Sequence, residues 1–522
     1  MSDTFPRQHA RTQRLTLGEP RNFTISPDGS RIVFARSATG SDPVNMLWVL
    51  DVESGTERLV LDPRNIPADL GALTDEEKRR RERAREGAGG VVTYSCDADV
   101  TKAVTVLGGQ VVVVDLLTDD VSTPAVAPGV FDARLSPDGT HIAYVRGATL
   151  CVGDLAGNER VIAHEDTANV TWGSADFIAA EEMGRQRGYW WSPEGTHIAA
   201  CRVDESAVDV WHIADPAHPE RPASEHRYPA AGTQNATVDL FVINVASATR
   251  TPVGLPAHRE YLNSVSWTDG GLIAQTQSRD QRAVTVSRID PATGDCTTVF
   301  EDIDDAWVEL VPGVPFADSH GHLVTCADRD GARRVLVDGV PVTPRHLQVR
   351  GVVSGGSRIV FTANETDTPW GQNVFSMNPD GSDLQNIHPL DGIVSATATG
   401  STVVARTSSL AASRAAFTVL LDNREIGIHS HAEEPLVSPN VRITEVGPRR
   451  IPVAIITPRD GRDTKLPVLF DPYGGPHAQR VLSSNAAFAT SQWFADQGFV
   501  VVVADNRGTP GKGSDWEREV LH

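Results

Sequence analysis

A short segment near the C-terminal end carries a side chain suited to acyl-transfer chemistry. Its sequence is LPVLFDPYGGPH (466–477), in which the apolar run Val468–Phe470 is typical of a strand buried on both faces. Gly474 and Gly475 follow, and glycines let a backbone approach another group closely. Tyr473 precedes them, so its hydroxyl could donate a hydrogen bond to an oxyanion that develops in a reaction. The alternative is that Tyr473 only packs at the edge of a sheet.

The elements after this loop form a strand–helix–strand unit. An amphipathic helix is expected over residues 487–495, and Gly498 can end it. Its apolar face is expected to contain Ala487, Phe488, Ser491, Phe494 and Ala495. The apolar strand Phe499–Ala504 follows, and this order predicts two parallel strands with a right-handed crossover. Such a unit opens an α/β-hydrolase domain, in which the loop after an early strand supplies part of the oxyanion hole.

The nucleophile of such a domain is missing from the sequence. α/β-Hydrolases carry it as a serine in a G-x-S-x-G turn that comes later in the chain, and no G-x-S-x-G occurs in the 522 residues. We therefore expect serine, aspartate and histidine of the triad to lie beyond residue 522. On this expectation the sequence is a fragment that is inactive alone.

Composition restricts the function classes. The 47 basic and 68 acidic residues give a formal net charge of −21, which argues against binding to nucleic acid or anionic membranes. No signal-peptide pattern opens the sequence, and no apolar run reaches the ~18 residues of a membrane span. Five widely spaced cysteines without a C-x-x-C pair favour free thiols in a reducing compartment, so we expect a cytoplasmic protein.

A hairpin motif recurs along the first 363 residues. FTISPDGSRIVFAR (23–36) returns as ARLSPDGTHIAYVR (133–146) and YWWSPEGTHIAACR (189–202), with weaker copies at 265–277 and 351–363. Each copy is a strand, a turn with Pro, Asp and Gly at the positions their chemistry suits, and a second strand. Many short strands built on one repeated hairpin favour a β-propeller over a sandwich. The repeats stop near Asp422.

One segment breaks the β pattern. LTDEEKRRRERARE (73–86) has a helical composition, and most of its faces are charged. A solvated surface helix explains such a segment. An alternative is an insertion that directs arginines toward a ligand.

Four segments together resemble the dipeptidyl peptidase IV subfamily of the prolyl oligopeptidase family of serine peptidases. They are FIAAEEMGRQRGYWWSPEG (177–195), RVDESAV (202–208), YPAAGTQNATVDL (228–240), and DPYGGP (471–476) with DNRGTPGKG (505–513). The Arg-rich helix is similar to one in cytoplasmic dipeptidyl peptidases. The implied fold is mainly β, with a propeller of eight expected blades over 1–432 and a partial α/β-hydrolase domain over 433–522.

The resemblance also implies roles for individual residues. Glu181 and Glu182 match the pair that holds the free α-amino group of a substrate, and two carboxylates suit a desolvated ammonium. Tyr473 matches the oxyanion tyrosine. Arg83 or Arg85 matches an arginine that binds a substrate carbonyl, and the sequence does not choose between them.

The implied function is a serine exopeptidase that releases N-terminal dipeptides of the Xaa-Pro or Xaa-Ala type. Its partners would be peptides with a free N-terminus and, in the full-length protein, a second copy of the chain. No cofactor or metal is expected, since the sixteen histidines show no H-E-x-x-H spacing. Alternatives are a non-catalytic propeller that binds peptides or proteins, and a tripeptidyl or other oligopeptidase of the same family.

Overall fold

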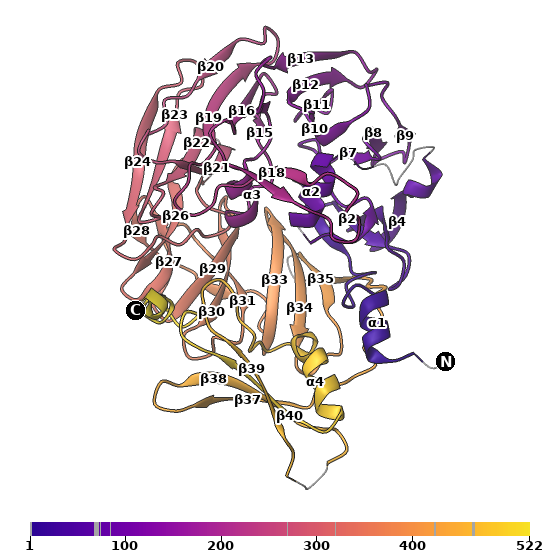
Figure 1. Cartoon of the computed structure of the whole chain (residues 1–522), viewed down its shortest axis with the longest axis vertical. Coiled ribbons are helices and arrows are strands. Elements are labelled where there is room, and N and C mark those ends of the chain that lie inside the picture. The colour runs from indigo at the N-terminus through magenta and orange to yellow at the C-terminus, as the bar shows by residue number, and fades with distance from the viewer. Residues whose placement is uncertain are drawn as a thin grey trace. The chain divides into compact units, whose positions relative to one another are not determined.

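A computed structural model describes residues 3–521 except 67–72, 74, 84, 269, 319, 422–423 and 462–464. The chain divides into two compact units. Unit 1 comprises residues 1–63, 88–92 and 309–522, and unit 2 comprises residues 64–87 and 93–308. The fold is mainly β, a propeller followed by the opening of an α/β-hydrolase sheet, as the sequence predicts (Figure 1).

Unit 1 contains four sheets of the propeller type, each with four strands in chain order. Gly89–Gly90 (β5) adds a parallel strand to β3 of the first sheet. The sheets are β1–β4 (Arg21–Ile25, Arg31–Ser37, Val44–Asp51, Thr56–Leu61), β25–β28 (Phe316–Ala317, Leu323–Arg329, Ala332–Val337, Val340–Pro341), β29–β32 (Leu347–Ser354, Ile359–Glu365, Asn373–Met377, Gln385–Asn386) and β33–β36 (Gly392–Thr399, Thr402–Ser409, Ala416–Leu421, Arg424–Ile428).

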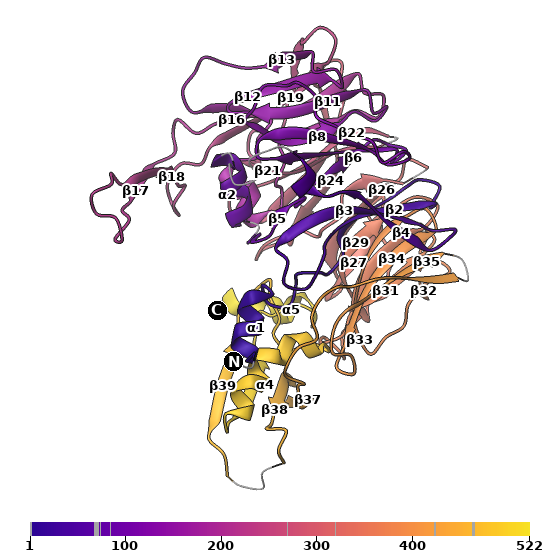
Figure 2. The ribbon, with the colours of Figure 1, turned by 90° about the vertical axis from the view of Figure 1, so that its right-hand side faces the viewer.

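Unit 2 contains four more such sheets, so eight are formed by the described residues. A hairpin, β17 (Val210–Ile213) with β18 (Ser224–Arg227), projects from this unit (Figure 2). The sheets are β6–β9 (Ser95–Cys96, Lys102–Leu107, Gln110–Asp115, Val121–Ser122), β10–β13 (Val130–Leu135, His141–Arg146, Thr149–Asp154, Glu159–Ala163), β14–β16 with β19 and β20 (Val170–Trp172, Tyr189–Trp191, His197–Asp204, Thr237–Asn244, Arg250–Pro252) and β21–β24 (Tyr261–Thr268, Gly271–Gln277, Ala283–Ile289, Cys296–Ile303).

The five repeated motifs form hairpins in five of these sheets: β1–β2, β10–β11, β15–β16, β21–β22 and β29–β30. In the turn before β2, Asp28 accepts hydrogen bonds from the hydroxyl of Ser26 and the amide of Ser30, at 2.5 and 3.0 Å. These donors stabilise the carboxylate and lower the pKa of Asp28 to about 2. The turn residues therefore set where each sheet begins its second strand.

The apolar faces of neighbouring sheets pack together inside each unit. Tyr189 is fully buried between β10–β13 and the sheet of β16, and Trp190 faces the opposite side toward β21–β22. Trp191 is partly buried and packs against the same core as Tyr189. All five cysteines are free; Cys96 and Cys296 are only half-buried.

The last sheet differs from the others. Its order is β37 (Val441–Val446), β38 (Ile451–Ile456), β40 (Val500–Asp505) and β39 (Val468–Tyr473). β39 and β40 pair in parallel, as the strand–helix–strand order predicts. The predicted boundary at 432/433 falls between β36 and β37, although unit 1 includes residues on both sides of it.

Two local expectations for this sheet are wrong. Val468 and Phe470 are 59% and 64% exposed, because β39 lies at the sheet edge and the described residues cover only one of its faces. A 3₁₀ turn, η2 (Asn485–Phe488), precedes α4 (Ala489–Asp496), and Phe494 of α4 is 38% exposed. Because an α-helix turns by about 100° per residue, Phe494 lies beside the face that the buried Ser491, Gln492 and Ala495 form and not within it.

The remaining helical segments are short. They are α1 (Phe5–Arg11), η1 (Pro63–Asn65), α2 (Asp75–Arg83), α3 (Phe177–Glu182), α5 (Ser514–Arg518) and η3 (Glu519–Leu521). α1 packs Phe5 against Ala489 of α4 in unit 1 (Figure 2). Within the described residues, no helix has the length and apolar character to cross a membrane, and no group of three or more His, Cys, Asp or Glu side chains is arranged to hold a metal ion.

Candidate active site

The helix α3 is fixed by a buried ion pair at its N-terminus. Asp176 is the N-cap and accepts a hydrogen bond from the amide of Ala179 at 3.1 Å. Its second oxygen pairs with Arg185 at 2.7 Å, and both side chains are nearly inaccessible. Arg185 also donates to the carbonyl of Leu262 in β21 at 3.0 Å. Removing one partner of a buried pair costs about 3–5 kcal/mol, so the helix is held rigidly on its sheet.

Glu181 and Glu182 form the last turn of α3, and both side chains are exposed. The side-chain amide of Gln186 donates to the backbone carbonyl of Ala180 at 2.6 Å and so satisfies one of the free carbonyl groups at this end. The C-terminus of a helix carries partial negative charge, so two carboxylates there create a strongly negative site. A cation bound at this point is stabilised by both carboxylates and by the helix end.

Aromatic side chains accompany the two glutamates, and the sequence analysis did not identify them. Phe177 precedes Glu181 by four residues and therefore lies on the same side of α3. Its ring makes an edge-to-face contact with Tyr228, at 5.3 Å between centroids, and Tyr228 contacts Trp211 of β17 in the same way at 5.5 Å. Tyr228 and Trp211 are 42% and 51% exposed. They belong to an accessible apolar surface beside the carboxylates.

The Arg-rich segment forms the helix α2. Glu77 accepts hydrogen bonds from Arg80 and Arg81 at 2.6–2.8 Å. Burial alone would raise the pKa of Glu77, but the two guanidinium groups hold it below its ordinary value. Arg83 is the last residue of α2, and its side chain lies outside the described residues. Arg85 is exposed in the following turn with φ of 49°.

Tyr473 ends β39, and its hydroxyl donates to the carbonyl of Pro476 at 3.1 Å. A tyrosine hydroxyl carries one hydrogen, so this bond excludes donation to an oxyanion at the same time. The loop is held by the turn after β40, since the amide of Asn506 donates to the carbonyl of Tyr473 at 2.7 Å and that of Gly475 to the carbonyl of Arg507 at 3.2 Å. These hydrogen bonds fix the backbone of the Tyr473 loop. The hydroxyl of Tyr473 can still exchange its bond to Pro476 for a bond to another acceptor.

Asp505, the last residue of β40, binds the segment that follows the Tyr473 loop. It is fully buried and accepts hydrogen bonds from the amides of Arg480 and Val481 at 2.8 and 3.0 Å. Burial raises the pKa of Asp505 to about 6, against the lowering effect of the two amides and the charge of Arg480. The segment that follows the Tyr473 loop is therefore attached to the end of β40.

A second set of contacts attaches this region to the propeller strands of unit 1. Glu517 of α5 pairs with Arg333 of β27 at 2.8 Å, and both side chains are buried. Arg350 of β29 donates to Gln479 at 2.6 Å, and Asn364 donates to the carbonyl of Gly511 at 2.8 Å. No motif in the sequence indicated these contacts, because they join positions more than 120 residues apart.

The comparisons with known proteins match most of this architecture. The family model for the dipeptidyl peptidase IV N-terminal region matches residues 105–410, and the model for the prolyl oligopeptidase family matches residues 485–522. The first match covers more than half of the chain. The chain belongs to the prolyl oligopeptidase family, in its dipeptidyl peptidase IV subfamily.

Individual proteins match the chain over a larger span. The probable dipeptidyl-aminopeptidase B of Paracoccidioides lutzii is 24% identical over 72% of the chain and 47% of its own length. The probable dipeptidyl peptidase 4 of Aspergillus flavus is 23% identical over 74% and 56%. The crystal structure of Porphyromonas gingivalis dipeptidyl peptidase 4 superposes with a TM-score of 0.78 at 19% identity, covering 99% of the chain and 76% of that protein.

The chain spans about half the length of the curated relatives it matches. Glu181 and Glu182 lie inside the region matched by the dipeptidyl peptidase IV model, whereas Arg83, Arg85 and Tyr473 lie outside both matched regions. Glu181, Glu182 and Arg85 belong to unit 2 and Tyr473 to unit 1. The roles of all five residues remain predictions.

Proposed function

We propose that this chain carries the peptide-binding part of a serine exopeptidase that releases N-terminal dipeptides of the Xaa-Pro or Xaa-Ala type. The subfamily of the chain and the names of its relatives support this class of reaction. In the proposal, Glu181 and Glu182 bind the free α-amino group, Arg83 or Arg85 binds a substrate carbonyl, and Tyr473 assists the oxyanion. The substrates are peptides with a free N-terminus.

The observation that carries the proposal is the position of the glutamate pair. Two exposed carboxylates lie at the end of a helix that a buried ion pair fixes to its sheet. A rigid site loses little entropy when it binds a ligand. An ammonium ion at this point gains charge-assisted hydrogen bonds that an acetylated amine cannot form. Because the pair binds the N-terminus itself, it would set the position of the cleaved bond relative to the first residue of the substrate.

The proposed oxyanion role requires one local rearrangement. The hydroxyl of Tyr473 must leave the carbonyl of Pro476 and turn toward the reacting carbonyl. A neutral hydrogen bond of this kind contributes about 0.5–1.5 kcal/mol, whereas donation to an oxyanion in a site without water is worth several times more. The exchange is therefore favourable once charge develops on the substrate.

Binding and hydrolysis test the proposal separately. We expect the tripeptide Ala-Pro-Gly to bind the 522-residue chain in isothermal titration calorimetry, and its N-acetylated form to bind at least tenfold more weakly. Because the sequence contains no G-x-S-x-G serine, we expect no release of nitroaniline from a dipeptidyl p-nitroanilide. Equal affinity for the two peptides would reject the amine site, and turnover blocked by a serine-directed phosphonate would reject the predicted inactivity.

Two further proposals concern the environment of the protein. Five free cysteines support a reducing, cytoplasmic location. A homodimer of the full-length protein is proposed from the family resemblance alone. Gel filtration with light scattering would measure the mass of the full-length protein.

A further inference from the structure

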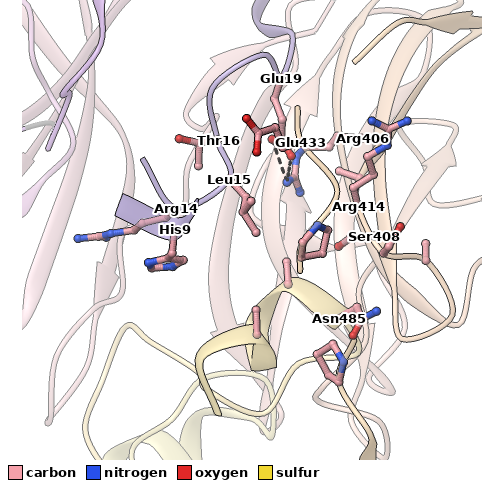
Figure 3. Close-up of a pocket in the computed structure, with 17 residues that line it drawn as sticks. His9, Arg14, Leu15, Thr16, Glu19, Arg406, Ser408, Arg414, Glu433 and Asn485 are labelled. Carbon is pink, nitrogen blue, oxygen red and sulfur yellow. Dashed lines mark hydrogen bonds and ion pairs between the residues drawn. The ribbon is translucent and has the colours of Figure 1, made fainter. Parts of the chain in front are cut away.

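A cavity in unit 1 is formed by segments that are far apart in the sequence. It lies among residues 9–19 at and after α1, residues 406–415 at the end of β34 and in the turn after it, the connection 433–439, and residues 485–489 of η2 and α4 (Figure 3). Its volume is about 150 Å³. A cavity of that size accommodates a molecule as large as benzene. None of the residues assigned above to peptide binding or to the oxyanion lines it.

The cavity lining combines aliphatic and cationic groups. Leu15, Ala415, Pro439 and Ala489 contribute apolar surface. The cationic side chains come from Arg14, Arg406 and Arg414. In Figure 3, Arg14 and His9 lie next to each other to the left, and Asn485 lies at the bottom. A ligand that fits both kinds of surface has a short apolar body and a charged end.

The ion pairs around the cavity leave one lining arginine without a carboxylate partner. Arg406 pairs with Glu19 at 3.2 Å, and Arg414 pairs with Glu434 at 3.0 Å. Arg14 is exposed, and among the residues that the structure describes its side chain forms neither a hydrogen bond nor an ion pair. One unpaired guanidinium suits a ligand with a single negative charge.

The two remaining ionisable residues of the lining are Glu433 and His9. Glu433 accepts a hydrogen bond from Arg11 of α1 at 2.9 Å, and Arg11 also pairs with Asp3 at 2.6 Å, so these three side chains together carry a net charge of −1. Burial lowers the pKa of His9, and the nearby charge of Arg14 lowers it further. The imidazole is therefore neutral at neutral pH and adds no second positive charge.

The backbone that carries Arg14 is strained. Gln13, Arg14 and Leu15 have φ angles of 49°, 66° and 64°, in the left-handed region that residues other than glycine rarely adopt. Such conformations cost about 1–3 kcal/mol each and persist where the surroundings enforce them. Here the amide of Arg14 donates to the carbonyl of His9 at 2.7 Å, and that of Leu15 to the hydroxyl of the buried Thr12 at 2.9 Å. The turn holds Arg14 at the cavity.

The cavity also contains an amide with unused bonding capacity. Asn485 is 7% exposed, lines the cavity, and its Oδ1 has no hydrogen-bond partner among the described residues. A half-turn of the amide exchanges its oxygen with its nitrogen. The side chain can therefore accept from, or donate to, a polar group of a bound molecule.

We propose that this cavity binds a small monocarboxylate with a short aliphatic tail. The carboxylate pairs with Arg14, the tail lies against Leu15, Ala415 and Ala489, and the amide of Asn485 is available to a second polar group of the ligand. Two sources share this chemistry, a free short-chain acid and the C-terminal residue of a peptide. The site does not depend on the proposed peptidase activity.

Calorimetric titrations of the 522-residue chain test the proposal with three probes. Isovalerate represents the free acid, N-acetylvaline represents a peptide end, and isovaleramide has the shape of isovalerate without its charge. Three variants are compared. Arg14→Gln removes the unpaired charge, Ala486→Leu adds bulk to the lining, and Arg7→Gln removes an exposed charge of α1 that does not line the cavity.

We expect one saturable site for isovalerate, for N-acetylvaline or for both, and the stronger of the two identifies the source. Arg14→Gln should weaken this binding about tenfold, the loss expected for one charge-assisted hydrogen bond. Ala486→Leu should weaken it also, and Arg7→Gln should not. Absence of saturable binding, equal binding of isovaleramide, or unchanged binding by a folded Arg14→Gln variant would each overturn the proposal.

Discussion

Two turns of unit 2 differ by a single methylene group. The sequences SPDGTHIA (136–143) and SPEGTHIA (192–199) are otherwise identical. Asp138 accepts hydrogen bonds from the hydroxyl of Ser136 at 2.5 Å and from the amide of Thr140 at 3.1 Å. Glu194 forms no hydrogen bond among the described residues. The extra methylene group of Glu194 moves its carboxylate past the hydroxyl and amide donors of its turn, whereas the carboxylate of Asp138 reaches the equivalent donors.

Exchanging these residues should move stability in opposite directions. Glu194→Asp should gain about 0.5–1.5 kcal/mol in the local free energy of opening, and Asp138→Glu should lose a similar amount, since each net hydrogen bond is worth about 1 kcal/mol. Hydrogen exchange at the amides of Thr196 and Thr140 measures the two changes. If both substitutions change the local free energy of opening in the same direction, the aspartate does not stabilise the turn.

Tyr473 gives a second prediction at the residue scale. An interaction formed only with an oxyanion contributes to the transition state and not to ground-state binding. Tyr473→Phe should therefore leave the affinity of the chain for Ala-Pro-Gly unchanged in calorimetry. A loss of affinity above about threefold would show that the tyrosine binds the peptide itself, and its proposed role would have to be revised.

At the scale of elements, Asp505 couples the terminal sheet to pH. Its pKa is raised from 3.8 to about 6 in the folded chain, so between these values the folded state binds more protons than the unfolded state. Stability from this group is therefore fully present below about pH 4 and is lost as the pH rises through about 6. The loss is at most about 3 kcal/mol, because a tenfold change in proton affinity corresponds to about 1.4 kcal/mol.

The variant Asp505→Asn should lack this dependence because its side chain does not titrate. Opening of residues 480–481, measured by hydrogen exchange corrected for intrinsic rates, should become easier in the parent relative to the variant as the pH rises from about 4 to about 7. A difference between the two proteins that stays constant over this range would contradict the buried, hydrogen-bonded position of Asp505.

The elements also show what sequence patterns can and cannot predict. Hairpins β10–β11 and β15–β16 were predictable because turn residues and alternating side chains are local signals. The exposure of Phe470 was not, since an apolar run does not reveal whether a strand is at a sheet edge. The exposure of Phe494 was not predictable either, because an apolar residue at the edge of a helix face can be buried or exposed.

At the scale of the molecule, the sequence predicted the propeller and the hydrolase opening through repetition and family resemblance. The candidate site was predicted unevenly. Glu181 and Glu182 stand in a recognisable motif, but nothing in that motif indicates that Arg185 pairs with Asp176 and so fixes their helix. The hydrogen bond from Tyr473 to Pro476 and the cavity beside Arg14 depend on loop conformation. Long-range packing determines such features, and no local pattern encodes it.

The central claim is that Glu181 and Glu182 bind a peptide's free amine. It predicts coupling between these side chains and that amine, measurable in a cycle that combines two glutamine substitutions with N-acetylation of Ala-Pro-Gly. Glu181→Gln and Glu182→Gln should each lower the affinity for the free peptide, by about 30-fold or more if the pair is desolvated. Neither should change the affinity for the acetylated peptide.

Glu194→Gln removes an exposed charge elsewhere in unit 2 and serves as the control. The account predicts a coupling of about 2–5 kcal/mol at Glu181 or Glu182 and none at Glu194. Calorimetry of the four protein forms with the two peptides gives these values directly. If the glutamine variants bind the free and acetylated peptides as the parent does, the glutamate pair is not the amine site and the proposed function fails.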